Sequence, residues 1–174
     1  MLLEATHLLL RRQPDLRFEV AAASEALAAE ISHALAEARM REGRFRVVTG
    51  GTAATMQRAF SGIVASGSAT LEAAYFRLPF VLIYKVAWPT YLAARLVVNV
   101  KYLGMPNVLA DKEVVPEFIQ HRAKGRAIAN AVLRLIDEPS TREQMISEFD
   151  AIIAKLGEGG ASDRAANAII NELG

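Results

Sequence analysis

The chain has 174 residues, of which 52% are hydrophobic and 22% charged, a composition typical of a single globular domain rather than of a disordered or fibrous protein. Twenty Lys and Arg residues are balanced by 19 Asp and Glu residues, and this net charge of +1 argues against a broad nucleic-acid-binding surface. There is no cysteine, which excludes disulfides, zinc–thiolate sites, iron–sulfur clusters and a cysteine nucleophile. Charged residues and a proline interrupt the most apolar stretch, residues 78–100, so no transmembrane helix is predicted.

The first half of the chain alternates helical patterns with short apolar runs. Apolar stripes at helical spacing and capping residues such as Ser24 mark the helices. In chain order the pattern predicts a helix to residue 12, a strand at 18–22, a helix from 24 to about 41, a strand at 45–49, a helix at 52–60 and a short strand at 63–65.

The second half continues this alternation and then becomes helical. We expect a helix through residue 77, a strand at 80–84, a helix at 89–98, a last short strand at 107–110 and a helical turn from Pro116. Three helices are expected to finish the chain, at 123–137, at 140–156 and at 162–173, the second with a capping box formed by Ser140 and Glu143. Glycines at 157, 159 and 160 indicate a hinge, so we predict one domain over residues 1–157 and a C-terminal helix within 158–174.

Short apolar strands that alternate with longer helices are typical of an α/β protein whose parallel sheet is covered on both faces. We therefore predict a Rossmann-like, doubly wound parallel sheet with right-handed crossovers. Ligands of such sheets bind at the carboxyl ends of the strands. The segments that follow Thr49, Ala65 and Tyr84 are therefore the places where a site is expected.

The segment after Ala65, residues 66–72, is rich in small and hydroxyl-bearing side chains and opens a helix. Backbone amides and hydroxyls in that position attract phosphate oxygens. The carboxylate of Glu72, in the first turns of the helix, can accept hydrogen bonds from two ribose hydroxyls. An ordinary Ser/Gly turn, with a glutamate that complements the helix dipole, explains the same spacing and is favoured when spacing alone is considered.

Other features allow a site but also have ordinary structural explanations. Gly50-Gly51-Thr52 fits neither a dinucleotide-binding nor a P-loop fingerprint, so a tight turn with an N-cap is favoured. Lys85 leaves a strand at the ligand edge, where it can meet a phosphate or simply extend into solvent. Aromatic and basic residues over 88–102 suit a lipid-facing groove or a helix packed on its own sheet. The acidic residues after Asn107 and the three histidines lack the spacing of a metal site, so no metal is predicted.

Several of these motifs together resemble the lipid-A-disaccharide synthases. The segment 65–74, with Ser-Gly-Ser-Ala-Thr-Leu-Glu at its centre, is similar to a motif of that family. The similarity continues in register at residues 1–5, 14–18, 79–86, 90–93, 103–110 and 113–117. Because the matching segments are collinear and cover nearly the whole chain, the resemblance is specific.

The family has the GT-B glycosyltransferase fold, in which the active site lies between two Rossmann-like domains. The resemblance therefore implies the C-terminal, UDP-sugar-binding half, followed by C-terminal helices. It implies transfer of 2,3-diacylglucosamine from its UDP donor to 2,3-diacylglucosamine 1-phosphate (lipid X), which gives lipid A disaccharide 1-phosphate and UDP. It further implies no metal or other cofactor, no nucleic-acid partner, and a cytoplasmic protein peripheral at the inner face of the cytoplasmic membrane.

Roles for individual residues follow from the resemblance by position. The residues implied to bind the UDP-sugar are Ser66, Gly67, Ser68, Thr70, Glu72, Lys85 and Asn107. Glu72 would hold the ribose, and the 66–70 segment would line the diphosphate. Asn107 and Glu113 are candidate cleft residues that face the donor sugar. The catalytic base is expected in the N-terminal domain.

The chain departs from the family pattern in two ways. Ser68 stands where the family usually has Thr, a mild change because the hydroxyl remains. The first strand of the domain, its Gly-Ser-Arg loop and the N-terminal domain are expected to be missing. The chain alone is then expected to be inactive, and two strands deprived of a central partner would make it poorly soluble or a homo-oligomer. The alternatives are another UDP-sugar GT-B transferase and a non-catalytic nucleotide-binding remnant.

Overall fold

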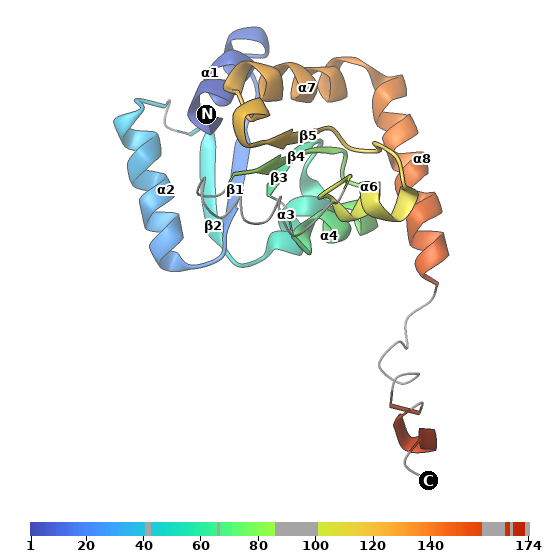
Figure 1. Cartoon of the computed structure of the whole chain (residues 1–174). Helices are drawn as coiled ribbons and strands as arrows, with labels where there is room; N and C mark the ends of the chain where they lie inside the picture. The colour runs from blue at the N-terminus through green and yellow to red at the C-terminus, as the bar shows by residue number, and fades with distance from the viewer. Residues whose placement is uncertain (41–42, 66, 86–100, 158–165, 168, 173–174) are drawn as a thin grey trace.

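Parallel strands packed between helices form the structure, a computed structural model that describes residues 1–40, 43–65, 67–85, 101–157, 166–167 and 169–172 (Figure 1). Strand β1 (Phe18–Ala22) pairs with β2 (Phe45–Thr49), and the aromatic rings of their first residues stack 5.0 Å apart. A second sheet has the order β3 (Gly62–Ala65), β4 (Phe80–Tyr84), β5 (Glu117–Ile119). Every pair is parallel, which confirms the α/β class that the alternating pattern predicts.

Helices cover the three-stranded sheet on two sides. In Figure 1, helices α1 and α7 lie together above it, while α3 and α4 lie below, and α8 runs down one side. In chain order the helices are α1 (Leu2–Arg12), α2 (Glu25–Glu37), α3 (Thr52–Arg58), α4 (Ala69–Tyr75), α6 (Met105–Ala110), a 3-10 turn (Gln120–Arg122), α7 (Gly125–Asp137) and α8 (Pro139–Leu156). None of the helices in the described part of the chain is long and apolar enough to cross a membrane.

The hydrophobic core lies around β4. Phe80, Val81 and Leu82 of this strand have no exposed surface, since both of its faces are covered. The ring of Phe80 stacks on that of Phe149 from α8, with 5.7 Å between the ring centroids. The β1–β2 pair is far less buried, and α2, which packs on it, has no fully buried residue. Stability is therefore concentrated in the three-stranded sheet and its helices.

The strands at 18–22, 45–49 and 80–84 are confirmed at the predicted boundaries. The helix that Ser24 caps is also confirmed, and the Ser24 hydroxyl accepts a hydrogen bond from the Leu27 amide at 3.3 Å. That helix ends at Glu37 rather than near residue 41, because Arg39 adopts a left-handed conformation with φ of 50°.

Three local predictions are wrong. The segment 107–110 is part of helix α6 rather than a strand, since Pro106 supplies a favourable first turn. The residues after Pro116 form strand β5 rather than a helical turn, because they complete the sheet beside β4. Helix α8 begins at Pro139 and not at a Ser140 capping box; the Thr141 hydroxyl instead donates to the Glu138 carboxylate at 2.7 Å.

Some sequence-based expectations fall on residues outside the described ranges. The helix at 89–98 lies there entirely, as do Gly159 and Gly160 of the expected hinge. Gly157 is described, and its φ of 74° ends α8. Of the expected last helix, residues 166–167 and 169–172 are described and helical.

The strands do not form one continuous sheet. Within the described residues, β1 pairs only with β2 and β3 only with β4, so each of β1 and β3 has one edge without a ladder partner. A doubly wound sheet of order 3-2-1-4-5 has its first strand at this position. The division into two sheets agrees with the expectation from the sequence that two strands, here β1 and β3, lack a central partner.

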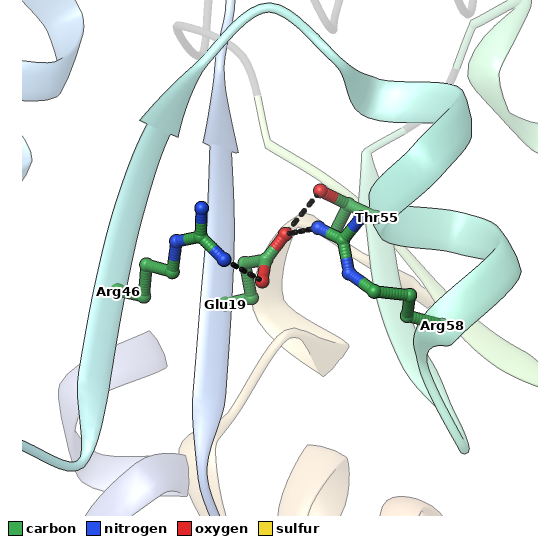
Figure 2. Close-up of polar contacts among 4 residues, drawn as sticks. All are labelled: Glu19, Arg46, Thr55 and Arg58. Atoms are coloured by element: carbon green, nitrogen blue, oxygen red, sulfur yellow. Dashed lines mark hydrogen bonds and ion pairs between the residues drawn. The ribbon is translucent and has the colours of Figure 1, made fainter.

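Glu19 joins β1 to helix α3, the connection between β2 and β3 (Figure 2). Its Oε1 accepts a hydrogen bond from the Thr55 hydroxyl at 2.5 Å and another from the Arg58 guanidinium. Its Oε2 lies 3.6 Å from Nη1 of Arg46 on β2. The Thr55 hydrogen bond, aided by the two guanidiniums and opposed by partial burial, holds the pKa of Glu19 below its ordinary value of 4.5.

We predict that Glu19→Gln lowers the melting temperature at pH 7 and that this difference shrinks in acid. A carboxyl whose pKa is lowered by folding adds stability above its unfolded pKa, and that stability is lost as pH falls through the folded pKa. Melting curves of both proteins from pH 7 downward would check this. Glu30→Gln, at an exposed site on α2, is the matched control. A melting difference that does not change with pH would contradict the prediction.

Candidate functional site

The carboxyl ends of the parallel strands β3, β4 and β5 meet at one edge of their sheet, which we call the carboxyl edge. The chain leaves this edge into the turn at Gly67–Ser68 after β3, at Lys85 after β4, and at the 3-10 turn after β5. Ligands of parallel sheets bind at such an edge because loops diverge there and helices begin there. Two of the predicted ligand-binding segments, those around Gly67 and Lys85, therefore lie at the expected place.

The turn after β3 requires a glycine. Gly67 has a φ of 140°, which disfavours other residues, and a Cβ atom at this position would meet nothing within 4 Å. Gly67 and Ser68 are both exposed, so their backbone is accessible from solvent. Glu72 is exposed in the first turn of α4. Ser66, the remaining member of the predicted turn, lies outside the described residues.

Thr70 is fully buried, although the resemblance implies that it lines the diphosphate. Its hydroxyl donates to the Gly67 carbonyl at 2.8 Å and accepts from the Met105 amide at 3.3 Å. The hydroxyl thus joins the Gly67–Ser68 turn to the start of α6. In this structure Thr70 therefore stabilises the turn through internal hydrogen bonds.

Asn107 is also fully buried, and both ends of its side-chain amide are occupied. Its Oδ1 accepts from the amides of Val114 and Val115 at 2.7 and 2.8 Å. Its Nδ2 donates to the Val115 carbonyl and to Glu117 Oε1, each at 2.8 Å. These contacts leave no polar atom of Asn107 pointing toward a ligand, so the side chain here holds α6 against the segment that leads into β5.

Glu117, the first residue of β5, gathers donors from the start of α6. Its Oε1 accepts from the Gly104 amide at 2.9 Å and from Asn107 Nδ2. Both carboxylate oxygens lie 3.1 Å from the Leu103 amide. The sequence places Glu117 in an acidic cluster but does not predict this hub, because its partners lie 10–14 residues away and no spacing rule links them.

Position 104 must be a small residue because its backbone lies close to the side chains of Leu82 and Glu117. A Cβ atom at this position would lie 2.7 Å from Leu82 Cδ1 and 3.2 Å from Glu117 Oε1. Any larger residue would therefore have to displace either the start of α6 or the fully buried Leu82 side chain. A Gly-X-Pro pattern before an apolar run marks a helix start, but the close approach to Leu82 is visible only in the fold.

The other candidate residues are exposed. Lys85 follows β4 directly and extends into solvent at the carboxyl edge. Glu113 is exposed and lines an open hollow of about 470 Å³ beside β5, together with His121, Arg122 and Lys124. The Gly50–Gly51 turn after β2 has two left-handed glycines and starts α3, as an ordinary turn would. Lys101 lies beside Tyr102, whose hydroxyl raises the pKa of the lysine.

Comparison with known proteins gives one consistent result. The family model described as lipid-A-disaccharide synthetase matches residues 1–169. The lipid-A-disaccharide synthase of Anaeromyxobacter dehalogenans (strain 2CP-C) is 34% identical over 172 residues, which cover 99% of this chain and 44% of that protein. That of Saccharophagus degradans is 36% identical, with 92% and 41% covered, and that of Geobacter sulfurreducens is 33% identical, with 100% and 44% covered. The chain thus spans less than half the length of these curated relatives.

We predict that Asn107→Ala destabilises the ligand-free protein by about 3 kcal/mol or more, because each buried group left without its partner costs about 1–3 kcal/mol. Denaturant unfolding monitored by circular dichroism would measure this. Lys85→Ala, at an exposed candidate residue, should change the free energy of unfolding by no more than about 0.5 kcal/mol. If the two variants were equally stable, Asn107 would not have the internal role that its contacts indicate.

Proposed function

The chain belongs to the lipid-A-disaccharide synthetase family, and we propose that it forms the nucleotide-sugar-binding half of such a glycosyltransferase. The proposed reaction transfers 2,3-diacylglucosamine from its UDP donor to lipid X and releases UDP. The family match over residues 1–169 carries the proposal, and the position of the Gly67–Glu72 segment at the carboxyl edge supports it. The match also favours this reaction over those of other UDP-sugar transferases.

In the proposed site the diphosphate lies at the Gly67–Ser68 turn. The turn exposes backbone at the end of a parallel strand, where amide groups can approach phosphate oxygens closely. Negative charge grows on the diphosphate as UDP leaves, and hydrogen-bond donors or cations placed there lower the barrier. Lys85, exposed at the end of the neighbouring strand, is proposed to supply such a charge.

Glu72 is proposed to bind the ribose. It stands one turn into α4, exposed and close in sequence to the proposed diphosphate turn. A free carboxylate accepts hydrogen bonds from two adjacent hydroxyls, which a ribose offers and a 2′-deoxyribose does not. Asn107 and Thr70, both buried, are proposed to support this surface rather than to contact the ligand.

The acceptor site and the catalytic base are proposed to come from polypeptide outside residues 1–174. The share of the relatives that the chain covers, 41–44% in the three proteins compared, supports this proposal. Transfer requires donor, acceptor and base in one geometry, so this chain alone is proposed to bind UDP without turning over. Peripheral attachment to the inner face of the cytoplasmic membrane is proposed because both substrates carry acyl chains. The division of the chain at residue 157 likewise remains a proposal.

We predict that the chain binds UDP weakly, does not bind ATP or NAD, and distinguishes UDP from dUDP through Glu72. Loss of the ribose hydrogen bonds to a charged partner should cost roughly 1.5–3 kcal/mol, a loss of about 10–150-fold in affinity. Calorimetric titration of UDP and dUDP into wild type and Glu72→Ala would measure this.

The Glu72→Ala variant should bind the two nucleotides with similar affinity, whereas the wild type should prefer UDP. Glu143→Ala, an exposed glutamate on α8, should retain the wild-type preference. Equal affinities in every combination would remove the ribose role from Glu72.

Within the described residues β1 and β3 each have one edge without a ladder partner, which supports the proposal that one more parallel strand lies between them. We predict that extending the chain with the preceding segment of a longer relative raises the melting temperature and tightens UDP binding together. A few hundred Å² of newly buried apolar surface, at about 25 cal/mol per Å², stabilises by several kcal/mol.

The matched control carries a proline in the middle of the added strand, since proline cannot donate to the ladder. Differential scanning calorimetry and UDP titration of the three proteins would decide the matter. The strand proposal would be wrong if the extended protein and its proline variant melted at the same temperature as the original chain.

A further inference from the structure

We propose that Glu117 is a positioning residue of the nucleotide-sugar site. Its carboxylate fixes the start of α6 and, through Thr70, the Gly67–Ser68 turn, without touching the ligand itself. This inference rests on the function proposed above for that turn. It assigns to Glu117 a role different from those of the exposed candidates Lys85, Glu72 and Glu113.

The backbone of Glu117 is held by the core. Glu117 is paired in register with Leu82 of β4, and the Leu82 amide donates to the Pro116 carbonyl at 2.9 Å. Leu82 has no exposed surface. The carboxylate therefore extends from a strand paired with the buried core strand β4 toward the start of α6.

Three donors converge on that carboxylate: the amides of Leu103 and Gly104 and the side chain of Asn107. Charged acceptors form stronger hydrogen bonds than neutral ones. Gly104 is also wedged against Leu82, where a Cβ atom would come within 2.7 Å. The start of α6 is thus fixed from one side by hydrogen bonds and from the other by packing.

The next amide along the chain, that of Met105, connects the start of α6 to the proposed site. The Met105 amide donates to the Thr70 hydroxyl at 3.3 Å, and that hydroxyl donates to the Gly67 carbonyl at 2.8 Å. The Thr70 amide donates to the same carbonyl at 3.1 Å. An unbroken series of hydrogen bonds and backbone therefore runs from Glu117 to Gly67.

The arrangement also determines where an anionic ligand can bind. The amides of Leu103 and Gly104 are occupied by the Glu117 carboxylate, whose negative charge repels a phosphate from the start of α6. The exposed Gly67–Ser68 turn has no such carboxylate among its contacts in the described residues. The same side chain thus shapes the proposed site and directs the diphosphate to one part of it.

The test compares Glu117→Ala, Glu117→Gln, Thr70→Val and Thr70→Ser with wild type, and Glu143→Ala serves as the control. Two quantities are measured on the 174-residue chain: the exchange rates of individual backbone amides and the dissociation constant for UDP. Gln keeps an acceptor oxygen at position 117, and Ser keeps the hydroxyl at position 70. Val has the shape of Thr without its hydroxyl. It therefore removes the hydrogen bonds of that hydroxyl to Met105 and Gly67 while leaving Glu117 and its donors in place.

We expect Glu117→Ala to speed amide exchange at residues 103–105 and also at residue 70, by about tenfold or more, as loss of about 1.4 kcal/mol of protection implies. Thr70→Val should speed exchange at residues 70 and 105 and weaken UDP binding about fivefold or more, since one hydrogen bond contributes about 1 kcal/mol. Thr70→Ser and Glu117→Gln should keep most of the wild-type exchange protection and most of the wild-type affinity for UDP. Faster exchange confined to residues 103 and 104 in Glu117→Ala would overturn the positioning role.

The two proposals can fail separately. If wild type does not bind UDP, the proposed function is wrong, and the exchange rates still decide whether Glu117 fixes the turn. If wild type binds UDP and Thr70→Val binds it equally well, the proposed function stands and the positioning role is wrong. Should Glu117→Ala not fold, Thr70→Val carries the test, and Thr70→Ser and Glu117→Gln are the variants expected to stay close to wild type.

Discussion

The position of α6 at the carboxyl edge depends on one half-buried carboxylate, that of Glu117. It accepts hydrogen bonds from two consecutive backbone amides and from Asn107, which in turn binds the backbone of Val114 and Val115. Removing the carboxylate would leave these donors without a partner in a partly dry environment, where an unmade hydrogen bond is costly. A charge fixed in this way determines geometry, because it decides where the start of α6 lies relative to β4 and β5.

The fold distributes its stability unevenly, and this matters for function. The β3–β4–β5 sheet is buried between helices and anchors the carboxyl edge, whereas the β1–β2 pair is half-buried, packs on α2 at its outer side (Figure 1), and is joined to α3 by the Glu19 contacts. A site built on the well-packed half is held more precisely than one built on the other. The Gly67–Glu72 segment belongs to that well-packed half, and the proposed donor site therefore has a rigid base.

Much of the fold could be predicted from the sequence, since apolar runs between glycine, proline and polar residues placed β1, β2 and β4 at their observed bounds. The prediction of a strand at 107–110 was wrong because a run as short as Val-Leu-Ala has no periodicity that distinguishes a strand from a helix. The motif around Gly67 was predicted to follow a strand at its carboxyl end, and the Gly67–Ser68 turn does follow β3 there. Burial of Thr70 and Asn107 could not be predicted, because Thr70 meets Met105 across 35 residues and Asn107 meets the start of β5, contacts that only the tertiary fold creates.

We propose that a nucleoside diphosphate binds at the Gly67–Glu72 segment of the carboxyl edge. Amide chemical shifts of the nitrogen-15-labelled chain, recorded during a titration with UDP, test it most directly because they locate the ligand without any substitution. We predict that the largest shifts fall on residues 67–72 and at Lys85, with saturation at one common dissociation constant. Shifts concentrated instead at the Gly50–Gly51 turn or beside His121 and Arg122, or no saturable shifts at all, would contradict the claim.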